Sequence, residues 1–312
     1  MRNVSLRQLR VVAAIARTGK VLTAADELGV TPPAVTVQLR QLEDSLGMAL
    51  FERTREGMRL TAAGRHLLQS AKRVDAELAS CAEVFNAMRG LKGGSASIGV
   101  VSTAKYFAPA ALGAFKRKHP DVDLKLFVAN REDTIAALAA LNLDVAIMGR
   151  PPENVDLKSA VLGDHPHVII AGPDHPLVQR RGLTIADLRE EIFLTREQGS
   201  GTRILMEKLF VEAGIMPRLG MEISSNETIK QAVMAGLGIA FISGHTVAAE
   251  IAMQRLMVLQ VEGLPILRQW RVVHHGEKRL MPAAAALWEF LQQEGRTFLP
   301  GFQFAGHAAS RD

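Results

Sequence analysis

The chain has a single cysteine, Cys81, and aromatic residues make up only 5% of its 312 residues. A lone cysteine cannot form an intramolecular disulfide, and the helical pattern around Cys81 favours a packing role for its thiol. No apolar run approaches the roughly 18 residues that a membrane-spanning helix needs. The N-terminus, interrupted by Arg7, Arg10 and Arg17, lacks the apolar core of a signal peptide. We therefore expect a cytoplasmic protein with no membrane segment.

Motifs of the common catalytic and metal sites are also missing. The sequence contains no G-x-x-x-x-G-K-[ST] phosphate loop, no H-E-x-x-H and no G-x-S-x-G. His165, His167 and His175 could suggest a metal site, but two of them precede a proline in turn-like segments, and no cysteine or carboxylate cluster completes a coordination shell. We predict that the protein is not an enzyme and that it holds no metal and no covalent cofactor.

Residues 22–46 have the pattern of two helices joined by a short turn. Gly29 can supply the positive φ that ends the first helix, and Thr23 and Thr31 are expected to cap the two helices. Pro32 and Pro33 fit the first turn of the second helix, where a missing N–H costs nothing. That helix has an apolar face and a polar face: Val35, Leu39 and Leu42 on the first, and Thr36, Gln38 and Arg40 on the second.

An ordinary helical hairpin would show the same periodicity, so the charge distribution decides the interpretation. Residues 1–73 hold twelve Lys/Arg and six Asp/Glu, a net charge of +6 in a chain whose total is +5. The other 239 residues therefore carry a net charge of −1. A basic excess confined to this segment is typical of a helix-turn-helix that binds the phosphates of double-stranded DNA.

The segment after the hairpin predicts a two-stranded ribbon over residues 51–60. Gly57 stands at its tip, flanked by Arg53, Arg55 and Arg59. We interpret this ribbon as the wing of a winged helix-turn-helix domain that occupies residues 1–60.

A long narrow apolar stripe follows the wing. From Leu60 to Met88, apolar residues recur mostly at three- and four-residue spacing. This pattern favours a linker helix over 61–89 that pairs with a copy of itself to form a homodimer, although a helix lying on its own domain would show the same spacing. The sequence Arg-Gly-Leu-Lys-Gly-Gly then predicts a hinge, which we place at 90–94.

From Ser95 onward, short apolar strands alternate with helices, which predicts an α/β fold with mostly parallel sheets. The expected strands are 96–101, 122–128, 143–148, 167–171, 192–194, 219–223, 239–242 and 270–274. The expected helices lie near 105–118, 131–141, 184–190, 202–213, 226–236 and 282–294. A region of this size suits two lobes with a cleft between them: lobe 1 at 95–163 and 266–300, lobe 2 at 164–265, and a C-terminal tail at 301–312.

Three junctions between a strand and a helix carry small polar residues, namely Ser102-Thr103, Gly199–Thr202 and Ser224–Asn226. Helix N-termini present free N–H groups and the positive end of the helix dipole, so their convergence at the strand ends would form an anion site. Lysines and arginines lie near these junctions in the sequence: Lys105, Arg150, Arg196, Arg203 and Lys230. Simple helix capping is the alternative explanation at each junction. Together these features predict a small anionic ligand, a phosphate or a carboxylate.

The motifs of the N-terminal region resemble those of the LysR-type transcriptional regulators. They are Leu6-Arg-Gln-Leu-Arg10, Ala24-Ala25, Thr31-x-Pro33-Ala-Val-Thr36, Leu42-Glu43, Leu46-Gly47, Leu50-Phe51-Glu-Arg53 and Leu60-Thr61-x-x-Gly64. The resemblance extends over essentially the whole chain. It implies a winged helix-turn-helix, a dimerising linker helix and a two-lobed effector domain similar to periplasmic binding proteins of type 2.

Within that family, several effector-domain segments resemble the subgroup that controls Calvin-cycle (RuBisCO) operons. They are 98–109, 146–152, 164–170, 199–203 and 224–238. For that subgroup the resemblance implies an anionic metabolite such as NADPH, ribulose bisphosphate or phosphoenolpyruvate as effector. It also implies homotetramers that bind and bend interrupted palindromes, relax the bend when effector binds, and contact RNA polymerase.

The resemblance implies that the start of the second helix and the wing contact DNA. The predicted DNA-binding residues are Thr23, Thr31, Pro32, Pro33, Thr36, Gln38, Arg40, Arg53 and Thr54. Many members have glutamine where this chain has Pro32, and a basic or polar residue where it has Val37. Neither side chain can hydrogen-bond a base, so base recognition would shift to Thr36, Gln38 and Arg40.

The predicted effector-binding residues come from the three junctions and the nearby cations. They are Ser102, Thr103, Lys105, Arg150, Arg196, Ser200, Gly201, Thr202, Asn226 and Glu227. Two other interpretations stay open: a regulator of another pathway with an aromatic or amino-acid carboxylate effector, and an enzyme or solute-binding protein with an appended helical dimerisation domain.

Overall fold

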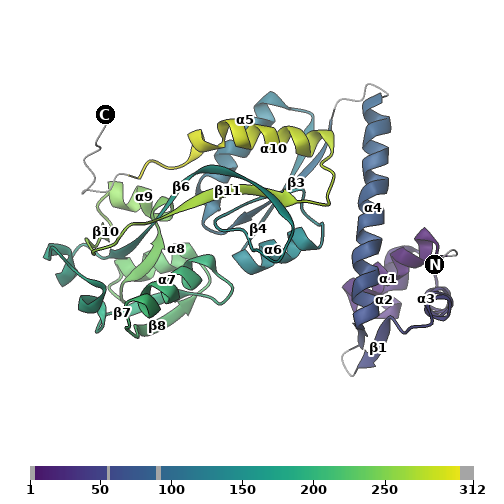
Figure 1. The fold of residues 1–312 in the computed structure, drawn as a ribbon, viewed down its shortest axis with the longest axis horizontal. Coiled ribbons are helices and arrows are strands. Elements are labelled where there is room, and N and C mark those ends of the chain that lie inside the picture. Colours follow the sequence, from purple (N-terminus) through teal and green to yellow (C-terminus); the bar gives the residue numbers. More distant parts are fainter. Residues whose placement is uncertain (1–3, 55–56, 89–92, 303–312) are drawn as a thin grey trace. The chain divides into compact units, whose positions relative to one another are not determined.

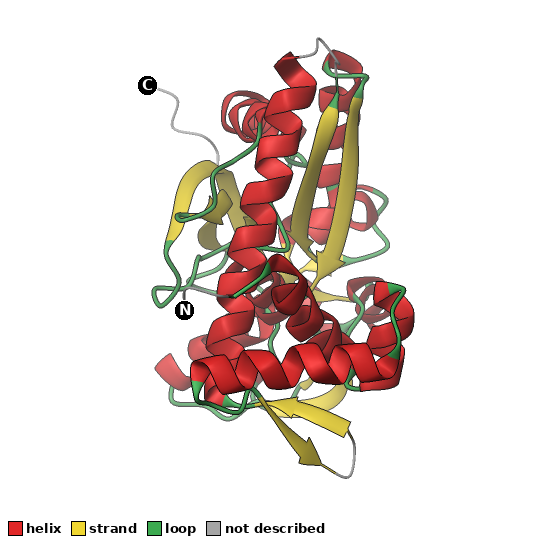
Figure 2. Ribbon diagram, turned by 90° about the vertical axis from the view of Figure 1, so that its right-hand side faces the viewer, coloured by secondary structure: helices red, strands yellow, loops and turns green. Residues whose placement is uncertain are grey.

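The computed structural model describes residues 4–54, 57–88 and 93–302, and the chain divides into two compact units, Met1–Leu91 and Lys92–Asp312. In the first unit the helices are α1 (Leu6–Thr18), α2 (Val21–Leu28), α3 (Pro32–Leu46) and α4 (Ala62–Met88) (Figure 1). The strands β1 (Phe51–Thr54) and β2 (Gly57–Leu60) form an antiparallel hairpin, the yellow ribbon at the bottom of Figure 2. Arg55, which was predicted to flank the tip, lies outside the described residues.

The helix-turn-helix forms where the sequence predicted it, with one correction. Gly29 adopts φ 63° and ends α2, as expected, and α3 begins with Pro32 and Pro33. However, Thr23 does not cap α2. Gly19, with φ 69°, ends α1 early, so Lys20 becomes the N-cap of α2 and Thr23 lies exposed inside the helix.

Thr31 does occupy the N-cap position of α3, but its side chain makes no capping hydrogen bond. Pro32 and Pro33 have no N–H, so the first turn has fewer donors that need an acceptor. Val35, Leu39 and Leu42 face the core of the unit, as their spacing predicted.

Polar contacts fix the wing to the helices. Glu43, near the end of α3, accepts hydrogen bonds from the backbone N–H groups of Leu50 (2.7 Å) and Phe51 (3.3 Å). In β2, Met58 N donates to Gly19 O at 2.8 Å, and a Cβ on Gly57 would lie only 2.4 Å from that same oxygen. The wing therefore has a fixed position beside α3 and requires glycine at 57.

Helix α4 has two different halves. Leu67 and Ala71 are buried, and Leu67 belongs to the core of the first unit. Farther along, Val74, Leu78 and Phe85 are 37%, 42% and 56% exposed. Cys81 is exposed too, so its predicted packing role is not met within the single chain. The predicted end of this helix at 89 and the hinge, apart from Gly93 and Gly94, lie outside the described residues.

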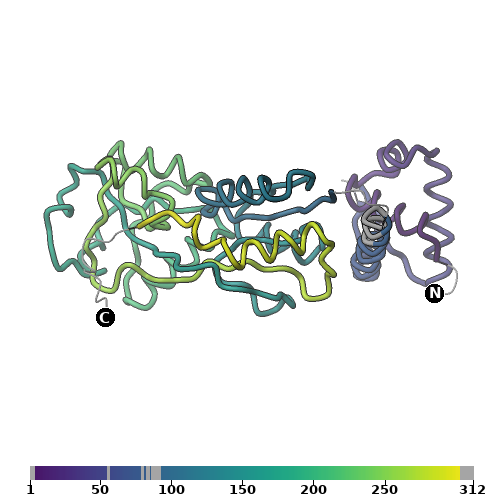
Figure 3. The backbone as a smooth tube through the Cα atoms, turned by 90° about the horizontal axis from the view of Figure 1, so that it is seen from above, coloured from purple at the N-terminus to yellow at the C-terminus, as the bar shows by residue number. Residues whose placement is uncertain are grey.

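The second unit is built on a seven-stranded sheet of order β10-β6-β11-β5-β3-β4, with β9 also paired to β6. These strands are β3 (Gly94–Val101), β4 (Val122–Ala129), β5 (Val145–Met148), β6 (Leu157–Ala171), β9 (Ala240–Ser243), β10 (Met257–Val258) and β11 (Ile266–His275). A separate parallel pair consists of β7 (Ile192–Arg196) and β8 (Arg218–Ile223). The α-helices are α5 (Ala108–Lys118), α6 (Arg131–Ala139), α7 (Gly201–Glu212), α8 (Asn226–Met234), α9 (Gly244–Ala252) and α10 (Pro282–Glu294). Helices α5 and α10 lie side by side over the sheet (Figures 1 and 3).

The prediction of mostly parallel sheets is wrong. Strand β3 pairs in parallel with β4 and β5, but β6 pairs antiparallel with β11, β9 and β10, and β11 with β5. The error comes from β6, which runs for 15 residues from Leu157 and was predicted only from residue 167. Apart from Leu162, its first eight residues are exposed or partly exposed, and Gly163 and Pro166 interrupt the apolar run.

Smaller corrections concern three segments. Helix α9 and strand β10 were not predicted, and the helix expected at 184–190 is a short 3₁₀ turn over Ile185–Leu188. Of the predicted tail, only Gly301 and Phe302 belong to the described residues. In the part of the chain that the structure describes, no helix combines the length and hydrophobicity needed to span a bilayer.

Three hydrophobic cores divide the second unit into two lobes. One core takes its residues from 96–162 and 270–291, and the other two cores, on opposite faces of β6 and β9, take theirs from 168–264. We name the first part lobe 1 and the second lobe 2. The antiparallel strands β6 and β11 run through both lobes, as Figure 1 shows, and their register shifts at Trp270, opposite Gly163.

Candidate functional site

The predicted DNA-binding residues lie on the outer side of α3 and on β1. Thr31, Pro33, Arg40, Arg53 and Thr54 are exposed, and Pro32, Thr36 and Gln38 are partly exposed. Thr23 is exposed on the preceding helix. The hydrophobic residues of α3 face inward, so its polar face is available to a ligand outside the unit.

Thr36 and Gln38 differ in the hydrogen-bonding groups that they leave free for DNA. The hydroxyl of Thr36 donates a hydrogen bond to Pro32 O at 3.0 Å, so its proton is used inside α3. Gln38 makes no such bond to the described residues and keeps both a donor and an acceptor for a base edge. At the wing, Thr54 Oγ1 donates to Gly57 O at 3.1 Å, which orders the turn.

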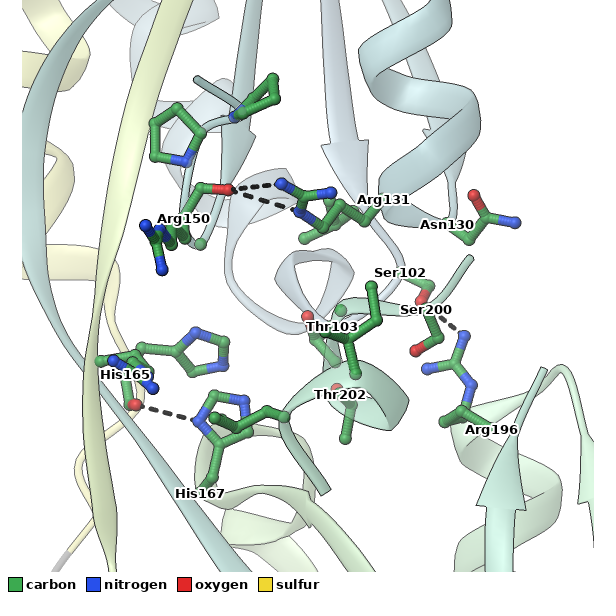
Figure 4. A pocket seen from close by; sticks show the side chains of 18 of the residues that line it. Ser102, Thr103, Asn130, Arg131, Arg150, His165, His167, Arg196, Ser200 and Thr202 are labelled. Atoms are coloured by element: carbon green, nitrogen blue, oxygen red, sulfur yellow. Dashed lines mark hydrogen bonds between the residues drawn. The ribbon is translucent and has the colours of Figure 1, made fainter. Parts of the chain in front are cut away.

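The second unit contains a cavity of about 530 Å³ between its lobes. Lobe 1 contributes the end of β3 with Ser102 and Thr103, the start of α6 with Asn130 and Arg131, and the segment after β5 from Gly149 to Asn154. Lobe 2 contributes β6, the end of β7 and the first two turns of α7, and Figure 4 shows these side chains around the open space. The size fits a small metabolite.

Cations dominate the charged lining of this cavity. Its basic residues are Arg131, Arg150, Arg196, Lys208 and Arg268, and Glu153 is the only acidic one among the described residues that line it. Arg131 donates two hydrogen bonds to Arg150 O, at 3.3 and 3.2 Å. Burial, and then the neighbouring Arg150 guanidinium, lower the pKa of Arg131. The Arg150 guanidinium also pairs with the Glu153 carboxylate, so Arg131 is the cation of the two that an anionic ligand would stabilise.

Arg196 links the two lobes. It is 3% exposed and lies at the end of β7 in lobe 2. Its guanidinium pairs with Glu197 through bonds of 2.7 and 2.8 Å, donates to Asn226 Oδ1, and donates to Ser102 Oγ of lobe 1 at 3.0 Å (Figure 4). Because Glu197 already pairs with it, Arg196 holds the lobes together more than it adds free charge to the cavity.

Two helices, α6 and α7, begin beside the cavity, and the N-terminus of α7 is better suited to bind an anion. Ser200, Gly201 and Thr202 line the cavity, and the first turn of α7 contains no acidic residue. By contrast, α6 has Glu132 and Asp133 in its first turn, which offset the positive end of its dipole. The two ends meet, since Glu132 N donates to Gly199 O at 3.3 Å.

Seven of the ten predicted effector residues line the cavity: Ser102, Thr103, Arg150, Arg196, Ser200, Gly201 and Thr202. Lys105, Asn226 and Glu227 do not line it, so the third junction lies beside the cavity and not in its lining. Asn226 is buried behind Arg196, and its Oδ1 accepts a hydrogen bond from the same guanidinium that donates to Ser102. Glu227 pairs with Lys230 at 2.8 Å, and Lys105 lies over the ring of Tyr106, with Nζ 5.3 Å from the ring centroid.

The sequence interpretation missed several lining residues. Asn130 and Arg131 follow directly after a predicted strand, so the signal that identified Ser102 and Thr103 could have found them. His165 was placed in a turn-like segment and His167 at the start of a strand, and both belong to β6. Lys208 and Arg268 carry no local signal, because only the packing of α7 and β11 brings them to the cavity.

The histidines of β6 belong to a buried aromatic cluster with His245 of α9 and Trp270 of β11. His165 stacks on Trp270, with ring centroids 3.7 Å apart, and lies 4.1 Å from the ring of His167. Trp270 Nε1 donates to His245 Nδ1 at 3.0 Å. Burial lowers the pKa of His167 to about 3 and that of His245 to about 4. Among the described residues, no group of three or more His, Cys, Asp and Glu side chains is arranged to hold a metal ion.

Comparison with known proteins identifies relatives of both units. Residues 6–65 match the family described as bacterial regulatory helix-turn-helix protein, lysR family, and residues 89–296 match the LysR substrate binding domain. The HTH-type transcriptional regulator CbbR of Xanthobacter flavus is 53% identical over 95% of this chain and 90% of its own length. The RuBisCO operon transcriptional regulator of Allochromatium vinosum is 44% identical over 94% of this chain and 97% of its own.

A solved structure resembles the second unit. The regulatory domain of CcmR from Synechocystis PCC6803, in complex with 2-PG, has a TM-score of 0.62 and 36% sequence identity. The match covers 64% of this chain and 96% of that chain.

The buried histidines predict a loss of stability in mild acid. In the unfolded chain a histidine gains its proton near pH 6.5, whereas folded His245 and His167 stay neutral down to about 4 and 3. Their stabilising contribution is therefore complete above pH 6.5 and falls as the pH decreases toward 4, by about 1.4 kcal/mol per pH unit for each histidine. Urea unfolding between pH 7.5 and 5, followed by the fluorescence of Trp270 and Trp288, measures this slope.

The variant His245→Asn is the control, because its side-chain oxygen can still accept from Trp270 but cannot titrate. We expect its pH slope to be smaller by about 1.4 kcal/mol per pH unit. An unchanged slope would contradict a neutral, buried His245.

Proposed function

The chain belongs to the LysR family of bacterial transcriptional regulators, and from this premise we propose that it controls a RuBisCO (Calvin-cycle) operon in response to a phosphorylated metabolite. Family membership places it among DNA-binding regulators with an effector domain and not among enzymes. The observation that carries the proposal is the cavity with five basic residues and one acidic residue, in a chain 53% identical to CbbR of Xanthobacter flavus. As a regulator of bacterial operons, it acts in the cytoplasm.

On DNA, α3 enters the major groove and the wing contacts the flanking phosphates. Gln38 is the principal base-reading side chain, because the proton of the Thr36 hydroxyl is already used by Pro32 O. Arg40 can reach either a base edge or a phosphate. Arg53 and Thr54 supply phosphate contacts at the wing, which position the domain without reading the sequence.

In the cavity, the effector anion lies between the N-terminus of α7 and the Arg131–Arg150 pair. Thr103 and Thr202 offer hydroxyl donors beside it (Figure 4). Phosphoenolpyruvate, ribulose bisphosphate and NADPH all carry the phosphate that this arrangement favours. The complex of CcmR with 2-PG supports a small ligand in the corresponding domain.

Ligand binding can alter the contacts that join the lobes. The bonds Arg196–Ser102 and Glu132–Gly199 both cross the cleft beside the cavity. An anion at α7 competes for the same donors, so it shifts the balance between arrangements of the two lobes. Such a shift would alter how the oligomer bends its operator and how it meets RNA polymerase.

Exposed apolar surfaces support a homotetramer. Val74, Leu78 and Phe85 on α4 form a surface for pairing with a second copy of the helix. A second surface lies on β4, an edge strand whose Leu126 and Phe127 are 44% and 40% exposed. Exposed apolar edge strands are favourable sites for association.

Separate substitutions at α3 and at the wing should have different effects on DNA binding. Gln38→Ala should reduce the preference for the RuBisCO promoter over random DNA by about 1–3 kcal/mol. Arg53→Ala should weaken binding to all sequences and lower the slope of log K against log salt by about 1. Fluorescence anisotropy at several salt concentrations measures both effects, with Arg117→Ala at an exposed position of α5 as the control. If Gln38→Ala leaves the preference unchanged, this docking of α3 is wrong.

Substitutions in the cavity should affect the effector and spare DNA binding. Arg131→Met should weaken phosphoenolpyruvate binding by about 10- to 100-fold, as expected for a lost charge-assisted hydrogen bond. Thr103→Ala and Thr202→Ala should weaken it less. Calorimetric titration with phosphoenolpyruvate, ribulose bisphosphate, NADPH and a neutral sugar tests this, with Arg117→Met as the matched loss of charge. Equal binding of the sugar would refute an anionic effector.

The oligomeric state should respond to both apolar surfaces. Leu78→Glu should disrupt pairing through α4, and Phe127→Glu should convert tetramers to dimers, because each places a charge in an apolar contact. Sedimentation velocity separates these species. Met253→Glu, at a residue that is 71% exposed, is the control. Tetramers that survive Phe127→Glu would exclude β4 from the interface.

A further inference from the structure

One polar atom beside the cavity is left without a partner by the rest of the protein. His165 is 4% exposed and lines the cavity, and its Nδ1 is buried and makes no hydrogen bond with any described residue. Figure 4 shows His165 and His167 together, on the opposite side of the space from Arg196. Buried polar atoms almost always have a partner, so an unused atom facing a ligand cavity calls for one.

The contacts of the other ring nitrogen identify Nδ1 as a donor. His165 Nε2 lies 2.9 Å from the hydroxyl of Ser243, which is fully buried and makes no other side-chain hydrogen bond among the described residues. If Nε2 carried the proton, the hydroxyl proton of Ser243 would have no acceptor. If Ser243 donates to Nε2, its proton is satisfied and the proton of neutral His165 is on Nδ1. The second arrangement leaves fewer buried donors without a partner.

The surroundings keep this donor rigid and uncharged. The ring of His165 stacks on Trp270 with an interplanar angle of 15°. The ring centroids of His167 and His245 lie 4.1 and 6.2 Å from that of His165. Burial first, and then the nearby His167 and His245, lower the pKa of His165 well below 6.5. The donor is thus a neutral N–H with a fixed direction, unlike the flexible cations that line the other parts of the cavity.

We propose that His165 is a specificity-determining residue whose Nδ1–H donates a hydrogen bond to a carboxylate or carbonyl oxygen of the effector. The inference rests on the proposed effector cavity and narrows its ligand: the effector carries a second oxygen acceptor in addition to its phosphate. A hydroxyl could accept the same bond, but it would also need an acceptor for its own proton, and the charged lining of the cavity is mostly cationic. A carboxylate or carbonyl oxygen brings no such proton.

A substitution at Gly149 can block access to His165 Nδ1 while leaving the histidine in place. Its backbone is not in the left-handed region, and a Cβ added there would have Nδ1 of His165, 3.9 Å away, as its only neighbour within 4 Å among the described residues. Gly149→Ala should therefore fold normally and place a methyl group against the donor. Gly113→Ala on α5, whose added Cβ would lie 3.7 Å from an Arg117 nitrogen, is the matched control far from this donor in sequence and outside the cavity lining.

The affinity test compares two probes on the full-length protein. For phosphoenolpyruvate, which has a carboxylate and a phosphate, Gly149→Ala should weaken binding about three- to tenfold, the effect of one lost hydrogen bond. For inorganic phosphate, which has no second group, the same substitution should change the affinity less than twofold. Equal losses for both probes, or none for phosphoenolpyruvate, would overturn the proposal.

Nitrogen NMR of histidine-labelled protein tests the donor directly. The resonances of His165, assigned by their absence in His165→Phe, should show the proton on Nδ1 in the ligand-free protein and a shift of that nitrogen on adding phosphoenolpyruvate. A proton on Nε2 overturns the inference. If neither probe binds the wild-type protein, the proposed effector class fails, whereas the position of the proton still decides whether His165 presents a donor to the cavity.

Discussion

The antiparallel pairing of β6 with β11 is the interaction on which the effector unit depends. These strands pair from Ile266–His167 to His275–Leu157 and run through both lobes, so each lobe contains one end of the same ladder. The pair carries His165 and His167 to one wall of the cavity, together with Arg268. Lobe movements must bend this ladder, and the register shift at Trp270 marks where its pairing is already irregular.

The two units attract anions by different physical means. In the first unit, exposed arginines of the helix-turn-helix and the wing face solvent, where their attraction to phosphates is long-range and weakened by salt. In the second, Arg131 and Arg150 lie close together beside a cavity, next to the N-terminus of α7. There the lower dielectric strengthens each contact, so a small ligand can be held by a few groups.

Discrimination between small anionic ligands comes from the uncharged wall of the cavity, where His165 and His167 lie. Cations and a helix end can hold almost any small phosphate, because charge attraction depends little on the shape of the ligand. The cluster of His165, His167, His245 and Trp270 is buried, stacked and uncharged at neutral pH. A fixed donor in that wall selects ligands by the position of an oxygen atom, a requirement that net charge cannot impose.

Local rules were enough to predict one group of features from the amino-acid sequence. The turn at Gly29, the prolines that begin α3, the apolar face of Val35, Leu39 and Leu42, and the hydroxyls of Ser102 and Thr202 all follow from periodicity, φ preference and the chemistry of helix ends. The antiparallel path of β6, the exposure of Cys81, and the meeting of Lys208, Arg268 and the histidines at one cavity were decided only by tertiary structure. Pairing partners and burial arise from residues distant in the chain, and no local pattern encodes which of them will pack together.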